Sequence, residues 1–356
     1  MRGIVFDGDA LRLTDDLRVR APQQGEVLVR VLRSGICHSD LNMVEAKMRV
    51  PIVVGHEAAG EIIALGPDVT DFAIGERVIV GTQTPCGECR ECERGTPANC
   101  DETWGITART PFTWNGQPTY SFANVSSFAE QIVARTSQLY RVGDLPPEQA
   151  ALIGCAVSTG YAAARVLGEA KPGDRVVVIG VGGIGVNAIA GARLAGAQVM
   201  AVDLNPDKEA AAREAGAEHF LATRQDLDRE ALVEAMRSAF APIDTVIECS
   251  GAPVAAEAAV GAAKRGGRVV LIGQTKPGAN MTVSLDAVTF GREIVGQLNG
   301  GARPELHYPE LIEHARARRI DLSAQVTKVW PMAEFEDAIA ALKAGQVTRA
   351  VLDLTI

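Results

Sequence analysis

Two cysteines and one histidine in the first half of the chain have side chains of the kind that bind a catalytic metal ion. Cys37 lies in the run 35–40 (GICHSD), directly after an apolar stretch that predicts a strand, and His56 follows the apolar residues 52–54. Cys155 lies farther along, in the run 154–160 (GCAVSTG). A catalytic zinc ion takes three such donors and keeps one position open. The three residues are therefore candidate zinc ligands, although any one of them alone fits a core position better.

Four more cysteines crowd into a single short segment. Their spacing is C-x2-C-x2-C-x7-C, at Cys86, Cys89, Cys92 and Cys100. Four thiolates complete a tetrahedral zinc shell, so the spacing predicts a structural zinc ion in an exposed lobe over 86–100. An iron–sulfur cluster and free surface thiols are the alternatives. Because the shell is closed, this metal would stabilise the structure without taking part in chemistry.

A glycine turn between a predicted strand and a predicted helix indicates a dinucleotide site. The apolar run 175–179 precedes 180–185 (GVGGIG), which opens an alanine-rich helix, and the next strand ends on Asp203. Glycines let the backbone approach a pyrophosphate at the helix N-terminus, and an acid after the second strand accepts hydrogen bonds from the adenosine ribose. Asp203 would repel a 2′-phosphate, and the next two residues, Leu204 and Asn205, bring no arginine to bind one. NAD is therefore predicted over NADP.

Size and charge narrow the class of function. The chain has 356 residues, enough for two domains, and a formal net charge of −9, which argues against general binding to nucleic acid or anionic membranes. Its first residues lack the apolar core of a secretory signal, and its most apolar stretch is broken by glycines. We therefore expect a cytoplasmic protein that acts on small molecules.

The residues between these motifs predict three successive segments and an α/β fold class. Short strands punctuated by glycine and proline, with no helical period before residue 145, indicate a mainly β domain over 1–155. Within it, 101–127 is expected to form a long loop. Alternating strands and helices over 156–297 indicate a doubly wound parallel sheet, and 298–356 would return to the first domain.

Together the motifs resemble the zinc-dependent alcohol dehydrogenases of the medium-chain dehydrogenase/reductase superfamily, in the branch of liver-type and thiol-dependent formaldehyde dehydrogenases. The resemblance runs from about residue 20 to the C-terminus and rests on the motifs above, Gly55-His56-Glu57, the run 118–130 and Thr348-Arg349. It implies a GroES-like, mainly β catalytic domain in two pieces, with a Rossmann domain inserted between them. It also implies two zinc ions per subunit, one catalytic and one structural, and a homodimer or homotetramer with a contact near 293–298.

The resemblance further implies reversible hydride transfer between an alcohol and NAD. Zinc lowers the pKa of a bound alcohol so that an alkoxide can form, and hydride leaves for the nicotinamide. Ser39 would take the hydroxyl proton. The residues assigned around the metal are Cys37, His56 and Cys155 as ligands, Glu57 as a nearby carboxylate and Asp40 as the group that orients His56. Cofactor contacts are expected from His38, Thr159, Gly180, Gly182, Gly183, Ile184, Gly185, Asp203, Lys208 and Arg349.

Two positions bear on the proton and on the substrate. Asn42 stands where many liver-type relatives carry the histidine that ends a proton relay, so the proton must leave through solvent, another group or the cofactor ribose. Thr82 stands where relatives often place an aromatic residue, which favours a roomier pocket for bulky or aromatic alcohols. The expected pocket residues are Met48, Thr82, Trp104, Phe122 and Asn299.

Two other functions remain open. A dehydrogenase or reductase for hydroxymethyl or nitroso thiol adducts would need cationic or polar anchors in its pocket, and Arg109 is the candidate. A non-catalytic NAD-binding redox sensor is the alternative from another class. The full set of candidate ligand residues argues against the sensor, because a protein without turnover has little use for them.

Overall fold

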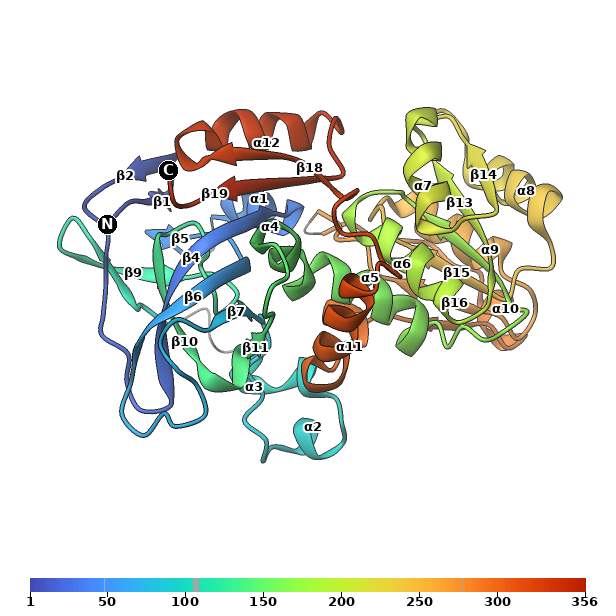
Figure 1. Cartoon of the computed structure of the whole chain (residues 1–356). Coiled ribbons are helices and arrows are strands. Elements are labelled where there is room, and N and C mark those ends of the chain that lie inside the picture. The colour runs from blue at the N-terminus through green and yellow to red at the C-terminus, as the bar shows by residue number, and fades with distance from the viewer. Residues whose placement is uncertain (48, 105–108, 277) are drawn as a thin grey trace. The chain divides into compact units, whose positions relative to one another are not determined.

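The computed structural model describes residues 1–47, 49–104, 109–276 and 278–356. The chain forms two compact units, Met1–Cys155 with Arg303–Ile356, and Ala156–Ala302. Figure 1 shows the red C-terminal strands lying beside the blue strands of the first unit, with which they share a sheet. No single helix in these described ranges is long and apolar enough to cross a membrane.

The first unit consists mainly of β-strands, as its short apolar runs predict. One six-stranded sheet and one seven-stranded sheet enclose an apolar core that includes Phe6, Val29 and Ile62. The strands are β1 (Gly3–Phe6), β2 (Leu11–Thr14), β3 (Arg18–Val19), β4 (Glu26–Ile36), β5 (Ile52–Val53), β6 (Glu57–Leu65), β7 (Arg77–Val80), β8 (Phe112–Trp114), β9 (Gln117–Ser121), β10 (Gln131–Arg135), β11 (Leu139–Arg141), β18 (Val326–Pro331) and β19 (Arg349–Asp353). The six-stranded sheet has the order β2-β1-β5-β9-β8-β3, and the seven-stranded sheet the order β11-β7-β6-β4-β19-β18, with β10 also paired to β4.

Strand β4 carries the first chemical motif at its end. It pairs antiparallel with β6 and β19, so Gly35 lies opposite Glu57 on one side and Val351 on the other. A β-carbon on Gly35 would lie 2.1 Å from Oε2 of Glu57. Only glycine therefore leaves room for that carboxylate beside β4.

The prediction of no helix before residue 145 was wrong for α1. Cys37 is the N-cap of this helix, and Asp40 accepts a hydrogen bond from the Cys37 N–H at 2.9 Å. Such capping does not require a periodic pattern of apolar residues, so hydrophobic periodicity does not predict this helix of 9 residues. The helices of the first unit are α1 (His38–Ala46), α2 (Arg90–Glu93), α3 (Asp101–Trp104), α4 (Pro147–Ala150), α11 (Pro304–Arg316) and α12 (Phe335–Lys343). Helix α12 packs across β18 and β19 (Figure 1).

The prediction of one long loop over 101–127 was also wrong. Strands β8 and β9 form a hairpin there, joined by Asn115 and Gly116 with φ of 50° and 73°. A two-residue turn with both φ values positive matches the twist of a hairpin, and Asn-Gly is its strongest sequence signal. Strand β9 then pairs in parallel with β5, which places Tyr120 beside Ile52.

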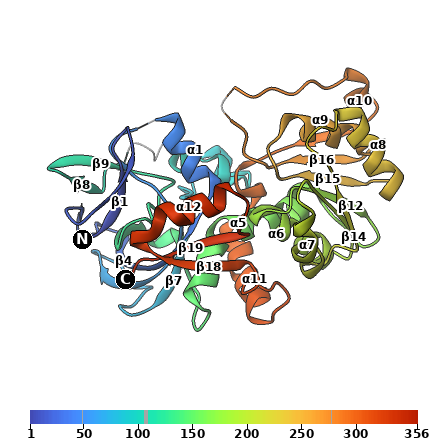
Figure 2. The same ribbon diagram turned by 90° about the horizontal axis from the view of Figure 1, so that it is seen from above.

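The second unit is a doubly wound α/β domain, as the alternation of its strands and helices predicts. Its strands are β12 (Arg175–Ile179), β13 (Gln198–Asp203), β14 (His219–Ala222), β15 (Thr245–Glu248), β16 (Arg268–Leu271) and β17 (Glu293–Val295), all parallel in the order β14-β13-β12-β15-β16-β17. Its helices are α5 (Ala156–Ala162), α6 (Gly183–Leu194), α7 (Glu209–Ala215), α8 (Arg229–Phe240), α9 (Pro253–Ala262) and α10 (Leu285–Thr289). Figure 2 shows α6 and α7 on one side of the sheet and α8 and α9 on the other. Both faces are covered, which is why the central strands are continuously apolar.

Candidate active site and metal centres

Donor atoms of Cys37, His56, Glu57 and Cys155 gather in the first unit, all within 4.8 Å of one another. The Nε2 atom of His56 lies 3.2 Å from Sγ of Cys155. Tetrahedral zinc with ordinary bond lengths would hold a nitrogen and a sulfur donor about 3.6 Å apart. Among the described residues, the buried Oε1 atom of Glu57 has no hydrogen-bond partner. Two sulfurs, one imidazole and a spare carboxylate oxygen therefore suit a zinc ion in type and spacing.

Each donor comes from the end of a regular element. Cys37 joins β4 to α1, and Cys155 follows the short helical turn Ala151–Gly154 that continues from α4. His56 lies between β5 and β6, after Gly55 at φ 88°. A β-carbon on Gly55 would lie 2.7 Å from the backbone nitrogen of Phe128, so glycine is required where this turn passes close to Phe128.

The buried carboxylate of Asp40 ties two of the donors together. It accepts hydrogen bonds from the backbone N–H groups of Cys37 and Gly55 at 2.9 Å each. Its Oδ1 also lies 2.9 Å from Nδ1 of His56. Because Nδ1 faces Asp40, Nε2 faces the sulfur atoms, which is the orientation that a metal-binding imidazole needs.

A hydroxyl and an aromatic ring flank the donor group. Ser39 donates a hydrogen bond from Oγ to Sγ of Cys37 at 3.0 Å, and the same Oγ lies 3.4 Å from Nε2 of His56. The ring of Phe122 stands edge-on to the His56 ring, with 5.4 Å between centroids and 89° between planes. A molecule held at the donors would therefore meet a hydroxyl group and an apolar surface.

Buried charge surrounds the sulfur atoms. Arg349 forms an ion pair with Glu57, and their side chains are only 5% and 0% exposed. Burial raises the pKa of the Glu57 carboxyl, although the charge of Arg349 opposes this effect. A hydrogen bond from the Cys155 thiol holds the pKa of Cys37 well below the usual thiol range against the effect of burial, with further help from His56. Thiolate is the form of cysteine that binds metals.

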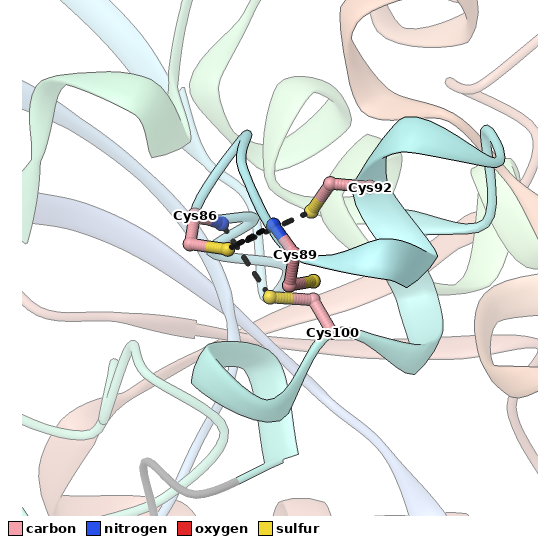
Figure 3. A group of neighbouring side chains, drawn as sticks. All are labelled: Cys86, Cys89, Cys92 and Cys100. Carbon is pink, nitrogen blue, oxygen red and sulfur yellow. Dashed lines mark hydrogen bonds between the residues drawn. The ribbon is translucent and has the colours of Figure 1, made fainter.

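The four clustered cysteines form a second group between β7 and β8 (Figure 3). The sulfur atoms of Cys86, Cys89, Cys92 and Cys100 lie within 4.8 Å of one another, and those of Cys86 and Cys92 are 4.0 Å apart. Four sulfurs on tetrahedral zinc would be about 3.8 Å apart. The Cys86 N–H donates to Sγ of Cys100 and the Cys89 N–H to Sγ of Cys86, while all four thiols are free of disulfides. The cluster suits a closed zinc site.

The glycine turn of the second unit has the form that a pyrophosphate needs. Gly182 is the N-cap of α6, and a β-carbon there would meet no atom within 4 Å, so its backbone faces open space. A β-carbon on Gly185 would lie 1.8 Å from the carbonyl oxygen of Gly180, so only glycine permits this close packing of helix on strand. Asp203 accepts a hydrogen bond from the Val181 N–H at 2.6 Å. The acid therefore lies beside the turn, where a nucleotide ribose would bind.

Comparison with known proteins agrees with these two kinds of site. Residues 23–144 match the alcohol dehydrogenase GroES-like domain, and residues 183–316 match the family described as zinc-binding dehydrogenase. The chain is 33% identical over 353 residues to proteins named S-(hydroxymethyl)glutathione dehydrogenase from Escherichia coli O1:K1 and Shigella sonnei, covering 95% of each chain. The chain belongs to the zinc-dependent alcohol dehydrogenase family. It is an oxidoreductase whose cofactors are zinc and NAD, as the sequence predicted.

Two solved structures place the chain in the same family. A zinc-binding-domain alcohol dehydrogenase protein from Burkholderia ambifaria is 28% identical, with a TM-score of 0.92 over 100% of this chain and 99% of the other. A benzyl alcohol dehydrogenase from Acinetobacter calcoaceticus is 27% identical, with a TM-score of 0.90 over 99% of this chain and 98% of the other. The predicted combination of a GroES-like and a Rossmann domain is confirmed.

The other cofactor residues that the family resemblance assigns occupy diverse settings. Arg349 is 4% exposed and paired with Glu57, whereas His38 is exposed at the start of α1. In the second unit, Thr159 is buried in α5, and Lys208 ends the short turn Pro206–Lys208. Their contacts with NAD stay predictions.

The expected pocket residues also differ in their settings. Thr82 and Phe122 belong to neighbouring segments, because Asn124 donates a hydrogen bond from Nδ2 to the Thr82 carbonyl at 2.8 Å. Asn299 is buried in the second unit at φ 54°. Met48 and the side chain of Trp104 lie outside the described residues.

One buried acid beside the glycine turn was missed from the sequence. Glu248, at the end of β15, is 2% exposed and accepts hydrogen bonds from the N–H groups of Ser250 and Gly251. Burial raises the pKa of Glu248. The loop that it holds faces the glycine turn, since a β-carbon on Gly180 would lie 3.1 Å from the Ser250 nitrogen. An acid closing an apolar strand was the available signal, whereas nothing in the sequence marked Arg349 as the partner of Glu57.

Proposed function

We propose that Cys37, His56 and Cys155 form the catalytic zinc site of an NAD-dependent alcohol dehydrogenase. The observation that carries the proposal is the convergence of these donors with the Ser39 hydroxyl, which lies 3.0 Å from Sγ of Cys37. Three protein donors leave zinc an open position for substrate. Cys86, Cys89, Cys92 and Cys100 form the structural site.

The protein groups around the metal bind and orient. Bound there, zinc would polarise the substrate oxygen and lower the pKa of its hydroxyl, and NAD would accept hydride. Asp40 holds the His56 ring with Nε2 toward the donor group. Ser39 Oγ accepts the substrate proton and donates its own onward, because a hydroxyl can do both at once. The Asn42 amide cannot act as a terminal base, so the proton leaves through solvent, another group or the cofactor.

Bulky or aromatic alcohols fit the first-unit groups best. The Phe122 ring lies beside His56, and Asn124, two residues later, bonds to the backbone carbonyl of Thr82, a small residue. An aromatic ring of a substrate can pack against Phe122 while its hydroxymethyl group reaches the donors. The benzyl alcohol dehydrogenase among the similar structures is named for such a substrate.

The test is a panel of aromatic and aliphatic alcohols and the matching aldehydes, followed through reduced nicotinamide with NAD and with NADP. We expect turnover of aromatic alcohols and a preference for NAD, because Asp203 beside the glycine turn disfavours a 2′-phosphate. Replacing Asp203 with Ala should reduce this preference. An enzyme that binds NAD but turns over no member of the panel would instead support the redox-sensor alternative.

Oxidation of a hydroxymethyl thiol adduct is the second candidate. The relatives at 33% identity are named for this substrate. Arg109, the anchor predicted from the sequence, lies 3.5 Å from Glu102, which also pairs with Arg135. Its charge is therefore shared within a surface cluster. Turnover of formaldehyde only when a thiol is added would favour this candidate over simple alcohols.

We infer a homodimer or homotetramer joined at the edge of the Rossmann sheet. Strand β17 is last in the sheet order and pairs only with β16 among the described strands. An edge strand offers unpaired backbone groups that a second copy can complete. Light scattering of the purified protein tests this, and Ile294→Pro, which removes a backbone donor from β17, should weaken the assembly.

We also infer a cytoplasmic location. All seven cysteines are free thiols. Disulfide bonds form readily in proteins outside the cell, so seven free cysteines are more typical of the reducing cytoplasm. Fractionation of expressing cells, with metal content measured on the recovered protein, would test this inference.

A further inference from the structure

Arg49 stacks on Tyr120, which lies two residues before the aromatic neighbour of His56. Its Cζ atom is 5.3 Å from the centroid of the Tyr120 ring, a cation–π distance. Phe122 follows two residues later in the same segment, with its ring edge-on to His56. Arg49 is therefore connected to His56 by a cation–π contact with Tyr120, two steps along the chain and the ring contact of Phe122.

The backbone sets this order. Strand β9 runs parallel to β5, with Tyr120 opposite Ile52, so Arg49 before β5 and His56 after it lie toward opposite ends of the pair. Ser121 is buried, whereas Tyr120 and Phe122, two positions apart, are both partly buried and pack against the apolar core of the first unit. Residues two apart in extended chain are about 7 Å apart. Tyr120, whose ring the Arg49 cation covers, thus lies roughly one such step from Phe122.

The charge of Arg49 is available to a ligand. In the described part of the chain no carboxylate forms an ion pair with it, whereas Arg109 and Arg135 share Glu102. Stacking on Tyr120 occupies only the flat face of the guanidinium. The N–H groups at its edge can therefore bind a carboxylate in the bidentate manner that arginine favours.

We propose that Arg49 determines specificity by binding a carboxylate at the end of the substrate remote from its hydroxyl group. The proposal rests on alcohol oxidation at the Cys37, His56 and Cys155 site, and it narrows the substrate class. The substrate is an alcohol whose flat or apolar middle lies along Phe122 and Tyr120. An aromatic hydroxymethyl acid has this chemistry, and so has the hydroxymethyl adduct of a carboxylate-bearing thiol.

The experiment compares para-(hydroxymethyl)benzoate with benzyl alcohol in the NAD-dependent assay of the zinc-loaded enzyme. Wild type should prefer the carboxylated alcohol. Arg49→Gln should lower the ratio of the two kcat/KM values by about tenfold or more, mainly through KM, because a hydrogen-bonded charge pair contributes that much. Arg49→Lys should keep part of the preference. Arg30→Gln is the matched control, since it removes a partly exposed arginine paired with Glu61 in the same unit, and it should leave the ratio unchanged.

An unchanged ratio in Arg49→Gln would overturn the proposal, and so would loss of the preference in Arg109→Gln instead. The source of the carboxylate is resolved by comparing hydroxymethyl adducts of glutathione and of mercaptoethanol with the two benzyl substrates.

Calorimetric titration of the NAD-loaded enzyme with benzoate and with benzyl alcohol separates the two proposals. Benzoate binding that is weakened in Arg49→Gln, without turnover of any alcohol, would uphold the role of Arg49 and reject the proposed oxidation. Turnover of neutral alcohols by an enzyme with no preference for carboxylates would uphold the proposed oxidation and reject the role of Arg49.

Discussion

The two metal-binding clusters differ in how far apart in the sequence their members lie. Cys86 and Cys100 are 14 positions apart within one loop, whereas His56 and Cys155 are 99 positions apart. Among the described residues, the loop cluster of Cys86, Cys89, Cys92 and Cys100 groups four sulfur donors. The distant cluster offers two sulfurs, one imidazole and one carboxylate, with a serine hydroxyl beside them.

The difference shows that a metal site with all positions filled by protein donors and a metal site with one free position need different structural support. A short loop can fold around four sulfurs and a metal with little help from its surroundings, because its closure entropy is small. The distant cluster, in the catalytic role proposed for it, would have to hold three donors apart so that a substrate could enter; it is called the open cluster below. Its geometry is therefore fixed by strands and by buried partners such as Asp40 and Arg349.

Replacing Cys37 should separate the clusters most sharply. Cys37→Ser removes one sulfur of the open cluster, but serine is a good N-cap, so α1 should remain. We expect kcat/KM to fall by about 10³ or more, because metal polarisation is worth several kcal/mol. Metal analysis should show about one ion lost per chain, with the circular dichroism spectrum unchanged. Retained activity would mean that the clusters have the opposite roles.

Ser39→Ala tests the hydroxyl that lies beside Cys37 in the open cluster. Alcohol oxidation should slow by about 10²-fold, the usual effect of losing a proton-transfer group. Metal content should be unchanged, because Ser39 contacts Cys37 without being a ligand. Ser39→Thr keeps the hydroxyl and should retain most of the rate. Near-normal turnover in Ser39→Ala would remove Ser39 from the mechanism.

Asp40→Asn weakens the support of the open cluster without removing a donor. The amide loses the charge that faces Nδ1 of His56, so affinity for the catalytic metal should fall about 10- to 100-fold. Competition with a chelator, followed by metal analysis, measures this change. The control Asp9→Asn alters an exposed acid of the same unit and should behave as wild type. Equal release of both metals would contradict the separation of the clusters.

Cys89→Ser should have the smallest effect on activity. The variant has one sulfur ligand fewer in the loop cluster, so it should bind the structural metal more weakly. Loss of a structural metal lowers the free energy of unfolding by an amount on the order of 3 kcal/mol. We expect a lower Tm and a lower metal content, with kcat/KM near that of wild type at moderate temperature. A loss of activity in Cys89→Ser as large as that in Cys37→Ser, with Tm unchanged, would contradict the structural role.

Local patterns predicted much of the fold and part of the site. The glycine turn was recognisable because strand, turn and helix are consecutive, and the structure places Asp203 next to it. The hairpin at Asn115 and Gly116 carried an equally local signal that was overlooked. Helix α1 was missed for another reason, since its capping by Asp40 leaves no apolar period to detect.

The sequence by itself determined the four-cysteine loop, the glycine turn and the alternation that builds the second unit, because each depends on residues close together in the chain. Only the tertiary structure decided that Glu57 meets Arg349, that Phe122 stands against His56 and that Arg49 stacks on Tyr120. These contacts follow from strand register, such as Gly35 opposite Glu57 and Val351. Register is set by the packing of whole sheets, and no short pattern specifies it.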